Sequence, residues 1–190
     1  MVLSALSLGV VAQWTGIVMP TFYTGMAFQD TIAVFNSTRI NTPPKLLGKQ
    51  WLLLYQQGPY WVIPVVLAAI FSNIHLSLSN PAPTAKRLYT LSAFLLASIP
   101  LTTIIHFEPG INGACKWKLN TLLADEGFHM GETNSLVPLT SKQSASPKTR
   151  LWADKVTMQE LVERWARKNV GRCVVAGAAV VLSGVATFCL

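Results

Sequence analysis

Charged and apolar positions are strongly segregated along this chain. Lys, Arg, Asp and Glu are absent from four stretches, residues 1–29, 50–85, 88–107 and 173–190. A helix that crosses the hydrocarbon core of a bilayer needs roughly 20 mostly apolar residues, and each stretch approaches or exceeds that length. A soluble core helix is seldom free of charge for so long, because one of its faces must meet water. The pattern therefore predicts an integral membrane protein.

The predicted fold class is all-α, with residues 1–190 forming a single membrane domain built as a four-helix bundle. We expect the spans at about residues 3–27, 61–78, 88–107 and 171–190. The composition agrees with this prediction, since 51% of the residues are hydrophobic and only 12% are charged. Typical soluble domains carry about twice that share of charge.

Amphipathic segments are predicted next to the spans. Residues 45–57 place apolar side chains at helical spacing with polar ones between them, and Gly58-Pro59 is expected to end that helix. A second amphipathic helix is expected to start near Val156 and to run on into the last span. Both predict helices at the membrane interface or folded back onto the bundle. The polar segment at about residues 124–154 is rich in Ser, Thr, Gly and Pro and predicts a mobile loop.

Small residues mark one face of the last span. Gly177 and Gly184 are seven residues apart and lie on the same side of a helix. Small side chains let helices approach closely in lipid, so this face is predicted to be a packing seam.

The net charge of +7 predicts an orientation in the bilayer rather than a nucleic-acid partner. Apart from Lys86 and Arg87, the basic residues lie in residues 28–60 and 108–171 or at Arg172, on the edge of the last span. By the positive-inside rule these two loops should be cytoplasmic and the termini lumenal or outside. The endoplasmic reticulum is the default membrane for a protein of this kind, and the lipid bilayer is the expected partner.

The sequence predicts no metal site. The three cysteines are scattered at positions 115, 173 and 189 without a Cys-x-x-Cys pair, which argues against a disulfide framework or a zinc site. A polar stretch carries three side chains able to bind a metal, Asp125, Glu126 and His129. Their spacing is not diagnostic, and no cofactor is predicted.

Polar residues near the cytoplasmic ends of the spans are the candidates for function, because such groups are costly in a bilayer. His106 can accept a proton near neutral pH, or it can be an interfacial or capping histidine. Arg172 can hold an anionic oxygen, or it can pair with Glu108 or lipid headgroups. Asn112 can donate to an oxyanion or cap a helix. The residues alone predict a small bundle with a polar pocket, and they do not distinguish an enzyme from a binding protein.

Four short motifs occur in a fixed order along the chain. They are Thr24-Gly25, Trp51-x3-Tyr55-x2-Gly58, Pro109-Gly110-Ile111-Asn112-Gly113 and Trp165-x3-Asn169-x2-Arg172. Together with four spans they resemble the family of small membrane proteins that includes fungal anthrone oxygenases. The resemblance covers nearly the whole chain except residues 124–154.

The resemblance implies a monooxygenase that converts an anthrone to an anthraquinone with O2 as co-substrate, in the biosynthesis of aromatic polyketides as secondary metabolites. The anthrone methylene is acidic because its carbanion is an aromatic enolate, so a base suffices to start the reaction. Under this hypothesis His106 is the base, and Asn112 and Arg172 stabilise the oxyanion. Under the same hypothesis, three side chains are expected to contact the substrate: Tyr55, Trp165 and Asn169.

The alternative is a non-catalytic membrane protein, either a partner of polyketide biosynthetic enzymes or a small-molecule carrier. The oxygenase predicts a ring-sized apolar pocket lined by His106, Asn112, Asn169 and Arg172. The alternative predicts no enclosed pocket, with Arg172 paired to Glu108 or to lipid.

Overall fold

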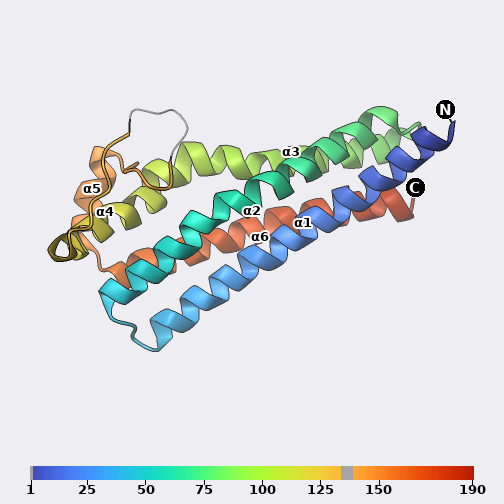
Figure 1. The fold of residues 1–190 in the computed structure, drawn as a ribbon. Coiled ribbons are helices and arrows are strands. Elements are labelled where there is room, and N and C mark those ends of the chain that lie inside the picture. The colour runs from blue at the N-terminus through green and yellow to red at the C-terminus, as the bar shows by residue number, and fades with distance from the viewer. Residues whose placement is uncertain (1, 134–138) are drawn as a thin grey trace. The chain divides into compact units, whose positions relative to one another are not determined.

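The computed structural model describes the backbone of residues 2–133 and 139–190, with side chains from residue 8 onwards. The chain is all-α, which confirms the predicted class (Figure 1). Its elements are α1 (Val2–Arg39), α2 (Pro44–Ser79), α3 (Pro83–Thr102), η1 (Thr103–Asn112), α4 (Gly113–Leu122), η2 (Ala124–Glu126), α5 (Pro147–Lys155) and α6 (Met158–Phe188).

Within the described residues, three helical stretches are long and apolar enough to cross a membrane: Pro44–Ser79, Pro83–Leu122 and Met158–Phe188. The first two contain the predicted spans at 61–78 and 88–107, and the third covers the predicted span at 171–190 as far as Phe188. Together they are consistent with a multi-pass membrane protein. The predicted first span, residues 3–27, falls within α1. Its opening side chains lie outside the described residues, so its role as a span stays a prediction.

The prediction that Gly58-Pro59 ends a helix is wrong, because α2 continues through it to Ser79. A proline removes one backbone donor from a helix and crowds the preceding turn. In an apolar environment, however, an unwound backbone would leave several polar groups without water. Continuing the helix is therefore the less costly solution.

The third helical stretch kinks at Glu108-Pro109-Gly110, just beyond the predicted end of the span at residue 107. The chain passes from α3 through the π-helix η1 into α4. Pro109 lies inside η1, and Gly110 has non-helical dihedrals of φ −100° and ψ −111° at a kink. The regular helical path is therefore interrupted at Gly110 and resumes in α4.

The segment predicted as a loop over 124–154 contains regular structure, which corrects that part of the prediction. It holds η2, an isolated bridge between Glu132 and Gln143, and most of α5. Ser146 caps α5 by accepting a hydrogen bond from the Thr149 N–H at 3.2 Å, and Pro147 follows as the first helical residue. Both are standard start signals for a helix. Residues 134–138 of the predicted loop lie outside the described residues.

The chain divides into two compact units. Unit 1 comprises Met1–Phe28, Tyr60–Pro100 and Gly171–Leu190, and unit 2 comprises Gln29–Pro59 and Leu101–Val170. Each unit therefore takes one part of each long helix. The prediction of a single membrane domain stays a prediction.

A chain of buried polar side chains links the helices of unit 1. The Asn73 amide donates to the Gly16 carbonyl at 3.4 Å, and its oxygen accepts from Ser183 at 2.6 Å. Ser183 in turn shares a 2.8 Å hydrogen bond with Ser92. These residues come from α1, α2, α3 and α6, so each polar group in the apolar core finds its partner on a neighbouring helix.

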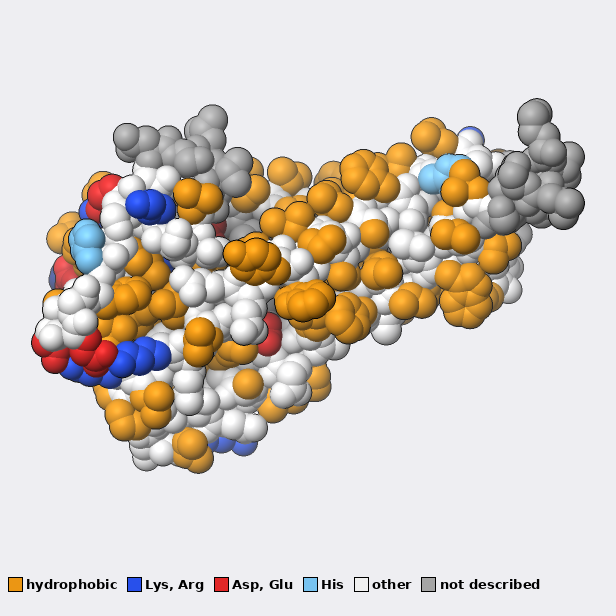
Figure 2. Space-filling model, viewed as in Figure 1, with side chains coloured by type: hydrophobic (Ala, Val, Ile, Leu, Met, Phe, Trp, Pro, Cys, Tyr) orange, Lys and Arg blue, Asp and Glu red, His pale blue; other side chains and the backbone are white. Residues whose placement is uncertain are grey.

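Unit 2 has its own apolar core, formed where α2, α4, α5 and α6 supply fully buried side chains. Its largest members include Trp51, Leu47, Leu119, Met158 and Leu161. In the view of Figure 2, charged side chains gather around α4 and α5, whereas hydrophobic side chains predominate along the long helices. The polar site described next lies within unit 2.

Candidate functional site

A buried carboxylate organises the polar interior of unit 2. Glu108, in η1, is 5% exposed, and four side chains donate hydrogen bonds to it. The distances to its carboxylate oxygens are 2.7 Å from Tyr55 Oη, 2.6 Å from Asn112 Nδ2, 2.9 Å from Lys116 Nζ and 3.0 Å from Ser144 Oγ. We call these five residues the Glu108 cluster.

Helical spacing explains half of this arrangement. Asn112 and Lys116 are four residues apart and lie on one face at the start of α4. Glu108 lies before the kink at Gly110 and contacts both of them. Tyr55 reaches the same point from α2, and Ser144 reaches it from the segment before α5.

Lys116 is fully buried, and its ammonium uses all three donors. Besides Glu108, it contacts the carbonyl oxygens of Leu139 at 3.4 Å and Lys142 at 3.0 Å. An ion pair survives burial only when its remaining hydrogen-bonding capacity is also satisfied. A carboxylate has about four acceptor positions, and those of Glu108 are directed at its four donors. The cluster therefore serves as an anchor, with little capacity left to take a proton from a substrate.

Buried aromatic rings pack beside the cluster in the core of unit 2. Tyr55 stacks on Trp51 with ring centroids 5.0 Å apart and planes 8° apart, and Lys116 Nζ lies 5.0 Å from the Tyr55 ring centroid. Trp165 meets Trp51 edge-on, with centroids 6.5 Å apart and planes at 88°. Trp51 is 1% exposed and is fixed between these neighbours.

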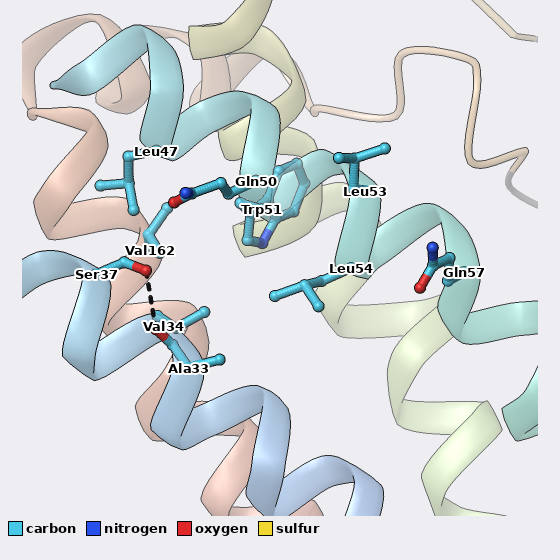
Figure 3. A pocket seen from close by; sticks show the side chains of 10 residues that line it. All are labelled: Ala33, Val34, Ser37, Leu47, Gln50, Trp51, Leu53, Leu54, Gln57 and Val162. Atoms are coloured by element: carbon cyan, nitrogen blue, oxygen red, sulfur yellow. Dashed lines mark hydrogen bonds between the residues drawn. The ribbon is translucent and has the colours of Figure 1, made fainter. Parts of the chain in front are cut away.

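A groove of about 350 Å³ lies beside Trp51 (Figure 3). It lies among α1, α2 and α6 and is lined by Ala33, Val34, Ser37, Leu47, Gln50, Trp51, Leu53, Leu54, Gln57 and Val162. This size is at the lower end of the range for small-molecule sites. Its walls are mainly aliphatic, and none of these lining side chains is acidic, basic or a thiol.

The structure brings three of the predicted site residues close to Glu108 or Trp51. Tyr55 and Asn112 both donate to the Glu108 carboxylate, and Trp165 packs against Trp51. These contacts stabilise the fold of unit 2. The roles predicted for the three residues toward a substrate stay predictions.

The other three predicted residues lie elsewhere. Asn169 is buried and donates to Thr31 Oγ1 at 3.1 Å. His106 is exposed on η1, with Nε2 3.2 Å from Lys168 Nζ; because an ammonium only donates, this ring nitrogen is the acceptor. Arg172 is half-buried and belongs to unit 1.

None of the six predicted residues lines the groove beside Trp51. The predicted convergence of His106, Asn112, Asn169 and Arg172 in one cavity stays a prediction, because Arg172 belongs to unit 1 and the other three belong to unit 2.

Sequence reasoning missed Lys116, Ser144 and the central role of Glu108. The spacing of residues 108, 112 and 116 is a detectable signal, but a helix assumed to end at Pro109-Gly110 conceals it. Ser144 gives no such signal, since it reaches Glu108 across 36 residues of chain.

The two acidic candidates for metal ligands, Asp125 and Glu126, form ion pairs with lysines instead. Asp125 pairs with Lys45 and Glu126 with Lys49 at the start of α2. The hydrogen bond from Lys45 lowers the pKa of the Asp125 carboxyl below its ordinary value. Over the described part of the chain, no three His, Cys, Asp or Glu side chains come together as a metal site.

These features define a class: a helical protein, consistent with multi-pass membrane insertion, with a buried polar cluster and a mainly aliphatic groove beside Trp51. Residues 51–182, more than half of the chain, match the family model described as anthrone oxygenase. The chain therefore belongs to the anthrone oxygenase family, which confirms the resemblance stated from its motifs. No curated protein and no solved structure matches it significantly.

Proposed function

We propose that this protein is a membrane monooxygenase that converts an anthrone to an anthraquinone with O2. The observation that carries the proposal is its membership in the anthrone oxygenase family over residues 51–182. The apolar, aromatic-edged groove beside Trp51 supports it, because a flat three-ring substrate needs an apolar site of this kind. Aromatic polyketide biosynthesis is the proposed pathway.

The reaction balances without an external reductant. A base removes one methylene proton, and the electron pair left on carbon forms a bond to O2. The resulting peroxide is protonated; its O–O bond then breaks as the second proton leaves the same carbon. One oxygen atom stays as the new quinone carbonyl, and the other leaves as water.

The proposed base is His106, and Asn112 and Arg172 are proposed to stabilise anionic oxygen. His106 is accessible on the surface of unit 2, although Lys168 must move away for Nε2 to accept a substrate proton. The Asn112 amide uses one N–H on Glu108, and we propose that its second N–H donates to a substrate oxygen. Tyr55, Trp165 and Asn169 are proposed to position the rings.

Turnover of an anthrone by purified protein in nanodiscs tests this function. We expect quinone absorbance to appear faster than in empty nanodiscs, with one ¹⁸O from ¹⁸O2 in each quinone. A His106→Ala, Arg172→Ala double variant should lose about 100-fold or more in rate, as expected when a general base is removed. His75→Ala is the control, since His75 belongs to unit 1 and has no proposed role. A wild-type rate equal to that of the double variant would contradict the proposal.

A second candidate is a carrier that holds an aromatic molecule without reacting with it. The absence of a titratable side chain among the groove-lining residues favours it, because such a groove offers no base. Tight binding of the quinone combined with no turnover above empty nanodiscs would select the carrier.

We further propose that residues 28–60 and 108–171 face the cytoplasm from the endoplasmic reticulum. Their excess of Lys and Arg supports this orientation. Soluble polyketide enzymes could then associate with this side and deliver the substrate.

A further inference from the structure

The indole N–H of Trp51 is a buried donor without an acceptor. Trp51 is 1% exposed, and its Nε1 has no hydrogen-bond partner. In Figure 3 this nitrogen lies on the edge of the Trp51 ring that is nearest to Leu54 and Val34, two residues that line the groove. Buried indole N–H groups ordinarily find an acceptor, so an unpaired donor on a ring that lines a groove points to a ligand oxygen.

The ring cannot easily turn to find a partner within the protein. Tyr55 stacks against it and is itself tied to Glu108 by a 2.7 Å hydrogen bond. Trp165 packs edge-to-face against the same ring. The Glu108 cluster therefore fixes the direction of the Trp51 N–H, and a donor held in advance costs little entropy when a ligand binds.

The remaining walls define what kind of ligand fits. Val34, Leu54 and Val162 offer aliphatic contact, and the exposed amides of Gln50 and Gln57 lie among the lining side chains. The Ser37 hydroxyl is already used, since it donates to the Ala33 carbonyl at 2.9 Å. A fixed neutral donor in an apolar wall selects an acceptor oxygen on an otherwise apolar body.

We propose that this groove binds a planar aromatic carbonyl compound and that Trp51 donates a hydrogen bond to its carbonyl oxygen. The inference rests on the proposed function for the substrate class, and it names the group that orients it. Trp51 then distinguishes an oxygenated ring system from a bare hydrocarbon of the same size.

Two ligands that share a ring skeleton test this. Anthraquinone and anthracene differ in their carbonyl oxygens, and equilibrium dialysis of protein-loaded against empty nanodiscs measures the affinity of each relative to lipid. Wild-type protein should prefer anthraquinone by about tenfold, because anthracene leaves the N–H unsatisfied. Trp51→Phe should remove most of this preference, since it keeps an aromatic ring but lacks the donor.

The matched control is Trp61→Phe, an exposed tryptophan of the same helix. It should keep the wild-type preference. If Trp51→Phe does not fold, Ala33→Leu provides the second variant, because it narrows the groove without touching the Glu108 cluster. It should weaken binding of both ligands at least fivefold.

The two proposals fail in different ways. A Trp51-dependent preference without turnover overturns the oxygenase and leaves the inference standing. Turnover by a protein that binds both ligands equally, or whose preference survives Trp51→Phe, overturns the inference alone. Unchanged binding in Ala33→Leu, or a lipid in the groove that anthraquinone does not displace in native mass spectrometry, also overturns it.

Discussion

At the scale of the residue, the interior of unit 2 depends on one charge. The Glu108 carboxylate is the common acceptor for Tyr55, Asn112, Lys116 and Ser144. It compensates the Lys116 ammonium, which is fully buried. Removing a single partner of such a pair leaves an isolated charge in an apolar core, which costs more than the pair itself contributes.

We therefore expect Glu108→Gln to lower the free energy of unfolding by about 3 kcal/mol, since Lys116 would lose its counter-charge. Glu108→Gln combined with Lys116→Met should recover at least half of this loss, because the double variant buries no charge. Denaturant unfolding in a fixed detergent, followed by circular dichroism, measures both.

Glu163→Gln is the control for this pair. Its partner Arg167 is 3.8 Å away and the side chains are 40% and 73% exposed, so the ion pair is solvent-screened. The change should cost less than about 0.5 kcal/mol. Equal losses in the Glu108 and Glu163 variants would contradict the anchoring role of Glu108.

At the scale of the element, the junction of η1 and α4 is the point where the segment before α5 packs most closely. A Cβ added at Gly113 would lie 2.6 Å from both the Cα and the N of Ala145, and 2.7 Å from the Glu108 carbonyl oxygen. These are backbone atoms and cannot turn aside. The close approach places Ser144 where its hydroxyl reaches the Glu108 carboxylate.

Gly113→Ala should accordingly destabilise the fold by about 2–3 kcal/mol, as overpacking against fixed atoms does. Gly184→Ala is the comparison, because nothing lies within 4 Å of a Cβ added there. That substitution should change stability by less than about 1 kcal/mol, in the stabilising direction if helix propensity dominates. A shift in melting temperature of similar size for both would contradict the packing argument.

The same comparison bears on the predicted seam of small residues. Neither Gly177 nor Gly184 has a described atom within 4 Å of an added Cβ. Among the described residues, these two glycines are therefore not points of close helix packing, whereas Ala176 and Ser183 beside them are buried.

At the scale of the whole molecule, the number of spans sets which side of the membrane each terminus occupies. Three apolar stretches qualify among the described residues, and α1 is the proposed fourth. With four spans both termini lie on one side, and with three they lie on opposite sides.

The reaction of single cysteines with a membrane-impermeant maleimide tests whether both termini lie on the same side of the membrane. Cys189 is exposed near the C-terminus and Ser141 is exposed in the segment between α4 and α5. In sealed microsomes with the cytoplasmic face outward, Ser141→Cys should react in a background lacking the other cysteines. The native Cys189, alone, should react only after permeabilisation, as should a single cysteine in an N-terminal tag. An N-terminal tag that reacts on the side opposite to Cys189 would contradict a fourth span.

The sequence by itself determined the helical class, the apolar stretches and the family. These follow from local features of the sequence. Long apolar runs without charge must avoid water, and short motifs in a fixed order can be recognised without knowing which residues are in contact. The start of α6 near residue 156 could also be predicted, since helix periodicity is local. The same reasoning mispredicted a helix end at Pro59, because the strength of a helix-breaking signal depends on what surrounds it. The signal at Pro109-Gly110 corresponds to a kink, after which the chain continues into α4.

Tertiary structure alone decided the site. Glu108 became an anchor because Tyr55 and Ser144 arrive from segments 53 and 36 residues away, and no sequence pattern encodes that meeting. The Trp51 N–H became an unpaired buried donor because its neighbours fix the ring beside the groove. Whether a polar group is satisfied depends on its distance to other groups in space, and only the fold sets those distances.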